Sequence, residues 1–506
     1  MASSLDSKRS IGKKMVIACD GTWQNSDQGY DDSVFAPPAA QIPSNVTRIV
    51  RAIKHKDDDG IPQVVFYQRG VGANGGEEDK IVGGATGVGL SEHVREAYGF
   101  LANNFDPESQ EALNDVSKPI DEIVLLGFSR GAFTARAISS LVSDVGVLTR
   151  AGMESFWGVF GDWMKQNVEG RQSEWFESRF GRKVSFTDPV YRQTLIEHGI
   201  TRWPMPIRAV GVWDTVGSLG IPLPFHAENV KEFSFVNTKV AVHVQHAFQA
   251  LGLDEHRRLF TPTLWEWPTN DQNLKKLKQC WFPGVHSNIG GSYPDAGISN
   301  ITLAWMISQF EESDGGILTF DPIYLDWLQD LNNEYYIKQA QPIRPWALSK
   351  IYDSAPHTTV KGIVAGLSPV VRTPGRYHVV NDKTGLGTNI PLKNTCEFIH
   401  PSVRIRMDSG GLGTEEDSKH VSEVSHLLNA AKGLVGLNWN LNKYSSPALK
   451  NYELVESVGV QNGTTGAGGV VWKAKDGSEG LPEEELGRTE IRLLKRSVDM
   501  ASKLQG

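Results

Sequence analysis

The chain has little cysteine and no long hydrophobic run. Only three of its 506 residues are cysteines, and Cys19, Cys280 and Cys396 are scattered, with no C-x-x-C unit. This spacing argues against a disulfide framework and against a zinc site. Cys19 and Cys280 fall in apolar, strand-like runs, so we expect them to be small core residues. No uninterrupted apolar segment approaches the roughly 18 residues of a membrane-spanning helix.

A basic stripe and a secretory leader are also missing. The net charge is −8, and lysine and arginine form no long cluster, so we expect no nucleic-acid partner. Residues 1–10 are polar and lack the apolar segment of a secretory signal. With 40% hydrophobic and 22% charged residues, the composition is that of a globular protein. Together these features predict a protein of the cytoplasm without a transmembrane segment.

The sequence does contain a serine in a pattern typical of a nucleophile. Residues 123–126 form a continuous apolar run, as expected for a strand buried on both faces. The pentapeptide GFSRG follows at residues 127–131, and a helix-like segment rich in small residues comes next. A G-x-S-x-G turn between a strand and a helix raises the serine hydroxyl above the edge of the sheet. We therefore expect Ser129 to be a nucleophile; the alternative is a tight turn with an idle serine.

A nucleophilic serine requires a base, and the base requires an orienting acid. In α/β-hydrolases the three follow in the order serine, acid, histidine. The next strong strand pattern ends at Asp214, and a later one is followed by a glycine-rich loop with His286. Because both would lie at carboxyl ends of strands, we predict a triad of Ser129, Asp214 and His286. The competing candidates are Asp254 and Asp295 for the acid, and His243, His246 and His256 for the base.

Two backbone N–H groups are expected to form an oxyanion hole. The amide of Arg130, directly after the nucleophile, is the first candidate. The second is expected from the loop after the first strand, where Gly21 permits a close backbone approach and either Gly21 or Thr22 could turn an N–H group inward. The same loop resembles half of a phosphatase aspartate motif. The second aspartate of that motif is absent, which argues against a phosphotransferase.

The segment GVGANG at residues 70–75 matches the dinucleotide pattern G-x-G-x-x-G. A dinucleotide site requires a helix to begin at once, so that its N-terminus meets the pyrophosphate. Acidic residues and a second glycine run at residues 83–89 follow here instead. We interpret both runs as active-site or packing loops, and expect no nucleotide, metal or organic cofactor.

The alternation of strand and helix patterns predicts an α/β fold, with a mostly parallel sheet covered by helices on both faces. We expect an α/β-hydrolase-like catalytic domain over residues 12–310, with a helical insertion at about 152–202 and a candidate lid at 217–237. Residues 311–506 are expected to form a C-terminal extension packed on this domain. The aromatic residues of the insertion either line an acyl pocket or form the insertion's own core. Residues 241–251 are predicted to be helical.

Six segments together resemble the type VI secretion phospholipase-effector-like catalytic domain family. The resemblance covers roughly residues 14–310 and implies an α/β-hydrolase fold with a triad of Ser129, Asp214 and His286. Some members of this family are phospholipases. The segments are CDGTWQN (19–25), YQRGVG (67–72), GFSRGA (127–132), VWDTVG (212–217), LDEHR (253–257) and WFPGVHSNIGGSY (281–293).

The expected function is that of a serine hydrolase that cleaves a carboxylic ester through an acyl-enzyme. A small-molecule ester, a lipid or a phospholipid is the expected substrate, and a peripheral membrane contact is compatible with it. Two alternatives stay open. One is a non-catalytic binding or scaffolding protein on a hydrolase fold. The other is acyl transfer to an acceptor other than water.

Overall fold

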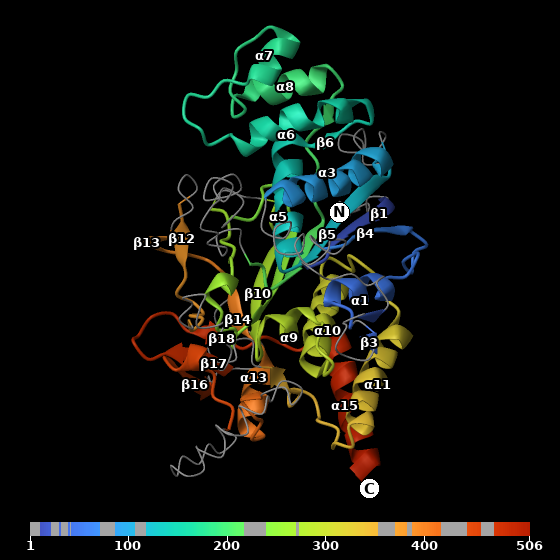
Figure 1. Cartoon of the computed structure of the whole chain (residues 1–506), viewed down its shortest axis with the longest axis vertical. Coiled ribbons are helices and arrows are strands. Elements are labelled where there is room, and N and C mark those ends of the chain that lie inside the picture. The colour runs from blue at the N-terminus through green and yellow to red at the C-terminus, as the bar shows by residue number, and fades with distance from the viewer. Residues whose placement is uncertain are drawn as a thin grey trace, which may run out of the picture.

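A seven-stranded sheet runs through the middle of the molecule (Figure 1). This computed structural model describes residues 11–21, 30–31, 39–40, 42–70, 87–106, 118–216, 239–269, 273–352, 370–381, 387–415, 443–456 and 470–505. The strand order is β14-β10-β9-β8-β5-β1-β4, and every neighbouring pair is parallel. The strands are β1 (Ile11–Cys19), β4 (Gln63–Gln68), β5 (Ile120–Phe128), β8 (Ala209–Trp213), β9 (His246–Gly252), β10 (Lys276–Phe282) and β14 (Glu397–Ile399).

The strand order reverses direction between β1 and β5. From β1 the chain first adds β4 on one side and then builds β5 and all later strands on the other. In open α/β sheets, ligands bind outside the carboxyl ends of the strands at such a point. Cys19 of β1 pairs with Gly127 of β5, so the loop after β1 and the turn after β5 leave the sheet side by side.

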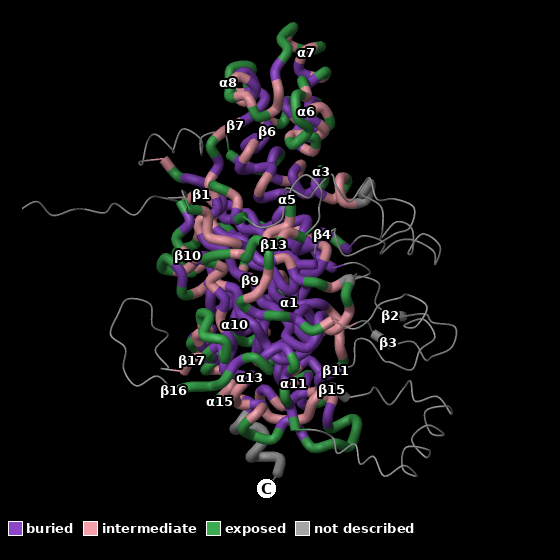
Figure 2. Tube along the Cα trace, turned by 90° about the vertical axis from the view of Figure 1, so that its left-hand side faces the viewer, coloured by how far each residue is buried: buried purple, intermediate pink, exposed green. Residues whose placement is uncertain are grey.

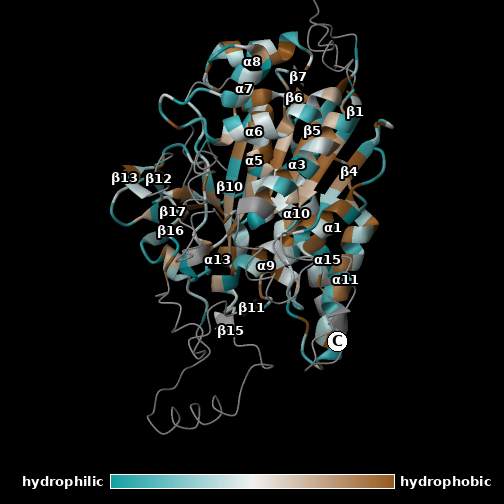
Figure 3. Cartoon of the chain, turned by 45° about the horizontal axis from the view of Figure 1, so that its top comes forward, coloured by the Kyte–Doolittle hydropathy of each residue, from teal (hydrophilic) through white to brown (hydrophobic). Residues whose placement is uncertain are grey.

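Helices cover both faces of the sheet, and each face has its own hydrophobic core. Along β1, Met15 and Ile17 point into one core, whereas Val16 and Ala18 point into the other. This period of two, apolar on both faces, is that of a strand in a covered parallel sheet. The strands form the apolar, buried centre of the chain in Figures 2 and 3. One face carries α3 (Gly87–Asn104) and α5 (Arg130–Val145); the other carries α1 (Asn45–Ala52), α10 (Gly297–Glu312) and α11 (Pro322–Lys338).

The mostly parallel α/β sheet expected from the sequence is confirmed, but one element was predicted wrongly. Residues 241–251, predicted to be helical, contain most of strand β9 instead. Every residue of β9 is buried, so the strand shows none of the apolar–polar alternation that would distinguish it from a buried helix. Cys19 and Cys280 are buried core residues, as expected.

The aromatic insertion forms a separate group of helices at one end of the molecule (top of Figure 1). It follows the C-terminus of α5, and α5 runs for 16 residues, or about 24 Å, away from Ser129. Its rings pack on one another: Phe156 lies 5.2 Å from Phe160, and Phe176 lies 4.7 Å from Tyr191. These contacts favour an insertion core over an acyl pocket. The helices are α6 (Phe156–Met164), α7 (Glu174–Phe180) and α8 (Pro189–Glu197).

Residues beyond 310 contribute to the same sheet and to its helical cover. β14 pairs with β10 as the edge strand, and α13 (Pro401–Asp408) follows it. The terminal helix α15 (Arg488–Gln505) lies beside α11, where Arg496 forms an ion pair with Asp330 at 2.7 Å. The three-stranded sheet of β16 (Tyr452–Glu456), β17 (Val470–Ala474) and β18 (Leu481–Pro482) also belongs to this part. The candidate lid at 217–237 lies outside the described residues.

The remaining strands are short pairs away from the central sheet. These pairs are β2–β3, β11–β15, β12–β13 and β6–β7, and the last of them joins the two ends of the insertion. Their bounds are β2 (Tyr30–Asp31), β3 (Ala39–Ala40), β6 (Val147–Leu148), β7 (Thr201–Arg202), β11 (Ile351–Tyr352), β12 (His378–Val380), β13 (Gly387–Pro391) and β15 (Thr414–Glu415).

Candidate active site

Ser129 occupies a strained turn between β5 and α5. Its backbone has φ 58° and ψ −123°, a region that non-glycine residues rarely populate. The two motif glycines make this turn sterically feasible. A Cβ atom on Gly131 would lie 2.2 Å from the carbonyl oxygen of Cys19, and one on Gly127 would lie 2.5 Å from the carbonyl oxygen of Gly131. Only glycine fits at both positions, so the motif dictates the turn that presents the serine.

The structure brings Ser129, His286 and Asp214 into one hydrogen-bonded chain. Nε2 of His286 lies 2.8 Å from Oγ of Ser129, and Nδ1 of His286 lies 2.6 Å from Oδ2 of Asp214. When Asp214 is ionised, Nδ1 must donate to it, and this tautomer leaves Nε2 free to accept the serine proton. The serine is 7% exposed and the other two residues are buried more deeply. The chain of contacts has the geometry of a nucleophile, a base and an orienting acid.

His286 is the first residue of the short helix α9 (His286–Gly290), just after β10. Its ring packs between Phe128 and Phe260, with both ring centroids 4.7 Å away. Burial lowers the pKa of His286, although the hydrogen bond to Asp214 acts in the opposite direction. This lowering of the pKa favours the neutral imidazole, which is the form that can accept a proton.

Asp214 is held by a residue to which no sequence motif pointed. Arg372 donates from Nη1 to Oδ1 of Asp214 at 2.6 Å and from Nη2 to Oδ2 at 2.9 Å. Burial alone would raise the pKa of Asp214, but Arg372 and His286 outweigh burial and hold that pKa well below its ordinary value. Asp214 also adopts a positive φ of 41° and accepts the N–H of Gly252 at 3.1 Å. The carboxylate is thus ionised and fixed in orientation.

The competing acids are engaged elsewhere. Asp254 accepts the N–H of Gly284 at 2.7 Å and hydroxyl groups from Tyr444 at 3.0 Å and Ser446 at 2.8 Å. Asp295 accepts the N–H of Lys350 at 2.6 Å. Asp254 nevertheless supports the site, because Gly284 lies only two residues before His286.

The competing bases also lie apart from the serine. His246 is paired with Asp314 through Nε2 at 3.1 Å, and Nδ1 of His256 lies 3.3 Å from the carbonyl oxygen of Val370. His243 packs its ring against Trp203, with centroids 5.4 Å apart. Among the residues that the structure describes, His286 is thus the histidine that it joins to Ser129.

The three candidate oxyanion donors, Gly21, Thr22 and Arg130, differ in what the structure shows of them. A Cβ atom on Gly21 would lie 3.4 Å from Cβ of Ser129, so the backbone at Gly21 passes close to the serine. The N–H of Gly21, however, donates to Oδ1 of Asp20 at 2.7 Å. Arg130 is the first residue of α5 and directly follows Ser129. Thr22 lies outside the described residues.

Asp20 is a buried polar centre beside this loop. Its Oδ2 accepts hydroxyl groups from Tyr67 at 2.6 Å, Ser44 at 2.8 Å and Thr47 at 3.1 Å. Burial raises the pKa of Asp20, and these hydrogen bonds oppose that rise. The network fixes the start of the loop that follows β1, next to the turn with Ser129.

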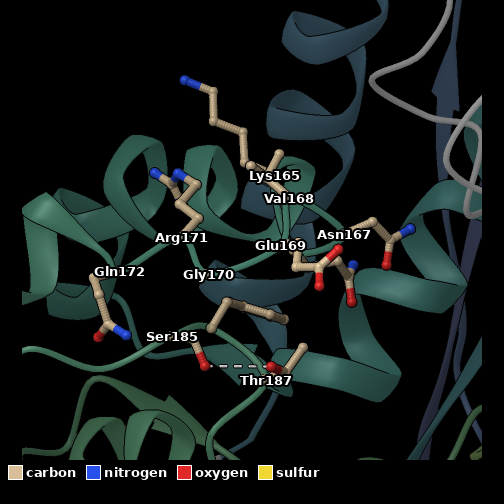
Figure 4. A pocket seen from close by; sticks show the side chains of 11 residues that line it. Lys165, Asn167, Val168, Glu169, Gly170, Arg171, Gln172, Ser185 and Thr187 are labelled. Atoms are coloured by element: carbon tan, nitrogen blue, oxygen red, sulfur yellow. Dashed lines mark hydrogen bonds between the residues drawn. The ribbon is translucent and has the colours of Figure 1, made fainter.

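A cavity of about 290 Å³ lies in the insertion rather than at the serine (Figure 4). Its walls are the loop at residues 165–172 and the segment at residues 185–187, where Ser185 and Thr187 are joined at 3.3 Å. No group of three or more His, Cys, Asp or Glu side chains within the described ranges could hold a metal ion. Across the same ranges, no helix is both long and apolar enough to cross a membrane.

Comparison with known proteins gives one curated relative and two solved structures of note. An uncharacterized protein of Saccharomyces cerevisiae is 24% identical over 277 residues, which are 50% of this chain but only 33% of that protein. The chain thus aligns with about a third of the relative's length.

The two solved structures align only loosely. The crystal structure of an uncharacterized protein from Pseudomonas aeruginosa aligns with a TM-score of 0.37 and 16% identity, over 67% of this chain and 52% of that one. A Tle1 effector bound to the VgrG spike of the type 6 secretion system aligns with a TM-score of 0.29 and 18% identity, over 57% and 52%. The family model of the type VI secretion system phospholipase effector Tle1-like catalytic domain matches residues 13–309, more than half of the chain. The chain therefore belongs to the Tle1-like phospholipase effector catalytic domain family.

Proposed function

We propose that the chain is a serine hydrolase that cleaves a carboxylic ester of a lipid or phospholipid. One observation supports this most strongly: Ser129, His286 and Asp214 form a single hydrogen-bonded chain at the carboxyl ends of the parallel strands. Membership of a phospholipase effector family implies a lipid hydrolase. The ester chemistry and the roles of the three residues belong to the proposal.

In the first step, Nε2 of His286 accepts the proton of Ser129 while Oγ attacks the carbonyl carbon of the ester. The imidazolium that forms is stabilised by Asp214 through Nδ1. The tetrahedral intermediate collapses when His286 returns the proton to the leaving alcohol. In the second half of the reaction, His286 accepts a proton from water while the water oxygen attacks the acyl-enzyme. His286 then returns the proton to Oγ of Ser129, and the carboxylic acid is released. No metal or organic cofactor takes part in these steps.

The oxyanion of the tetrahedral intermediate is assigned to two backbone N–H groups. The amide of Arg130 is one donor, and the loop at Gly21 and Thr22 supplies the other. Because the N–H of Gly21 donates to Oδ1 of Asp20 in the structure, Gly21 can serve as the donor only after a small rotation of this peptide. Loss of one such donor typically lowers kcat about 10²- to 10³-fold.

A fluorophosphonate probe tests the proposal directly, because it reacts with activated serines. The folded chain should be labelled once, on the peptide that contains Ser129, and Ser129→Ala should not be labelled. His286→Ala should label far more slowly, since the base is gone. No labelling of the folded wild type, or labelling that persists in Ser129→Ala, would refute the serine hydrolase.

A further inference from the structure

Arg372 donates hydrogen bonds from Nη1 and Nη2 to Asp214 and to two backbone carbonyl oxygens. Besides the two bonds to Asp214, Nη1 donates to the carbonyl oxygen of Gly252 at 2.6 Å, and Nη2 donates to that of Phe260 at 2.7 Å. Arg372 is 3% exposed. A planar guanidinium that binds both carboxylate oxygens fixes the plane of the carboxylate, which a single point charge cannot do.

The same carboxylate oxygen serves both Arg372 and the base. Oδ2 of Asp214 lies 2.9 Å from Nη2 of Arg372 and 2.6 Å from Nδ1 of His286. Rotation of the carboxylate would break both contacts together. The arginine thereby controls the direction in which His286 is held, and its positive charge opposes protonation of the imidazole.

Arg372 comes from outside the segment that matches the family, residues 13–309. The residues next to Arg372 form hydrogen bonds to the edge strand β14 and to other parts of the chain. Gly375 donates its N–H to Glu397 of β14 at 2.8 Å, and Tyr452 donates its hydroxyl to the carbonyl oxygen of Pro374 at 2.7 Å. Val370 donates its N–H to the carbonyl oxygen of His256 at 2.9 Å. Hydrogen bonds on both sides of Arg372, at Val370, Pro374 and Gly375, therefore hold the segment that carries it.

We propose that Arg372 is a positioning residue that the C-terminal part of the chain contributes to the active site, so that the family-matched segment holds the triad without the arginine that orients its acid. This inference rests on the proposed function, since it assigns Asp214 and His286 their roles. Arg372 touches neither the serine nor, in this scheme, the substrate. It acts by orienting Asp214 and by lowering the proton affinity of His286.

The predicted signature is a change in the pH profile. The charged groups that face His286 or Asp214 are Glu255, Arg257 and Arg372, and Tyr377 lies near the arginine. Of the two cations, Arg257 lowers the pKa of His286, and Glu255, which Arg257 contacts at 2.9 Å through both Nε and Nη2, raises it, so this ion pair acts on His286 in opposite directions. Removal of Arg372 should therefore favour the imidazolium, and the acid limb of kcat/KM should move to higher pH by roughly one to two units.

The test compares Arg372→Gln and Arg372→Lys with the wild type on a small soluble ester, over a range of pH. Both variants should lower kcat roughly 10²-fold, because neither side chain can form the bidentate contact to the carboxylate of Asp214. Only Arg372→Gln should shift the acid limb, because lysine keeps the positive charge.

Arg404→Gln is the matched control. Arg404 belongs to the same C-terminal part and also forms a bidentate contact to a buried carboxylate. It donates to Glu483 from Nη2 at 2.7 Å and from Nε at 2.9 Å. Its loss should leave the pH profile unchanged. A control that shifts the limb as far as Arg372→Gln would reduce the effect to general destabilisation and overturn the inference.

Three further outcomes are decisive. An Arg372→Gln variant with the kcat and acid limb of the wild type would overturn the inference while leaving the proposed function intact. If Arg372→Gln does not fold, Arg372→Lys becomes the test. A kcat of Arg372→Lys equal to that of the wild type would overturn the inference. If the wild type itself neither hydrolyses the ester nor reacts with the fluorophosphonate, the proposed function has failed instead.

Discussion

The two ends of the parallel sheet hold buried side chains in different ways. At the carboxyl end, Ser129 and Asp214 sit at positive φ, and Asp214 is a buried charge held between an arginine and a histidine. At the other end, the insertion buries aromatic rings in ordinary helices, where Trp163 packs against Phe160 and Phe176 packs against Trp175. The positive φ angles of Ser129 and Asp214 cost on the order of 1–3 kcal/mol per residue in backbone strain.

The contrast separates residues that serve chemistry from residues that serve stability. The insertion places its polar groups in closed local networks; Asp162, for example, accepts hydrogen bonds from Ser173, Arg171 and Tyr191. The carboxyl end instead leaves a serine hydroxyl facing a histidine. Mutations at the two ends should therefore fail in different ways, and the next four predictions test this separation.

The largest effect is expected at the acid. Asp214→Asn should lower kcat about 10⁴-fold, because an amide favours the wrong tautomer of the histidine. It should also lower stability by about 3–5 kcal/mol, because Arg372 loses its buried partner. Asp254→Asn, compared on the same p-nitrophenyl ester below both melting temperatures, should lower kcat far less. If only Asp254→Asn abolishes activity, the acid has been assigned to the wrong residue.

At the insertion, the effect should fall on stability alone. Trp163 is fully buried and donates its Nε1–H to Asp144 at 2.8 Å. Trp163→Ala should lower the free energy of unfolding by about 3–5 kcal/mol and leave kcat/KM of the folded protein unchanged. Trp157 of the same helix is 53% exposed, so Trp157→Ala is the matched control with a small change in stability. A loss of ester hydrolysis in folded Trp163→Ala would restore the acyl-pocket interpretation.

A smaller effect is expected at the support beneath His286. Tyr444→Phe removes the hydroxyl that binds Asp254 at 3.0 Å. Stability, measured by urea unfolding, should fall by about 1 kcal/mol. Ester hydrolysis should change only a few-fold, because the hydrogen bonds of Asp254 to Gly284 and Ser446 persist. A 10²-fold loss of activity would show that the carboxyl end depends on this contact more than its geometry suggests.

The smallest effect is a displacement of the pH profile. Burial lowers the pKa of His286, and the neutral imidazole is the active base. Activity should therefore be retained as the pH falls to about 6.5, the ordinary value for histidine, and decline only below it. The profile of kcat/KM, followed by chromatography of the released acid, measures this limb. A half-maximal point above pH 7 would mean that the base is not buried as the structure has it.

The sequence allowed candidate residues to be named at the carboxyl end because each signal there is local. The glycine spacing around Ser129 and the polar residues at two strand ends are visible without a structure, and the predicted parallel sheet is confirmed. The roles of Ser129, Asp214 and His286 stay predictions until activity is measured. The lid and Thr22 fall outside the described residues.

The role of Arg372 and the strand β9 could not be predicted from local sequence signals. Arg372 meets Asp214 across 158 positions of sequence, and no motif surrounds it. Strand β9 was missed because burial on both faces removes the alternation that marks a strand. The place of the insertion could have been inferred, because a segment between a helix and the next parallel strand lies at the amino edge of the sheet, opposite the site.

The central claim is most directly tested by the release of carboxylic acid from a panel of esters. Purified wild type and Ser129→Ala should be incubated with a short-chain ester, a long-chain ester and a phospholipid, and the products should be separated and quantified. The account predicts that the wild type releases acid from at least one of them and that Ser129→Ala releases about 10⁴-fold less. Equal release by the two proteins, or no release by the folded wild type from any ester, would contradict it.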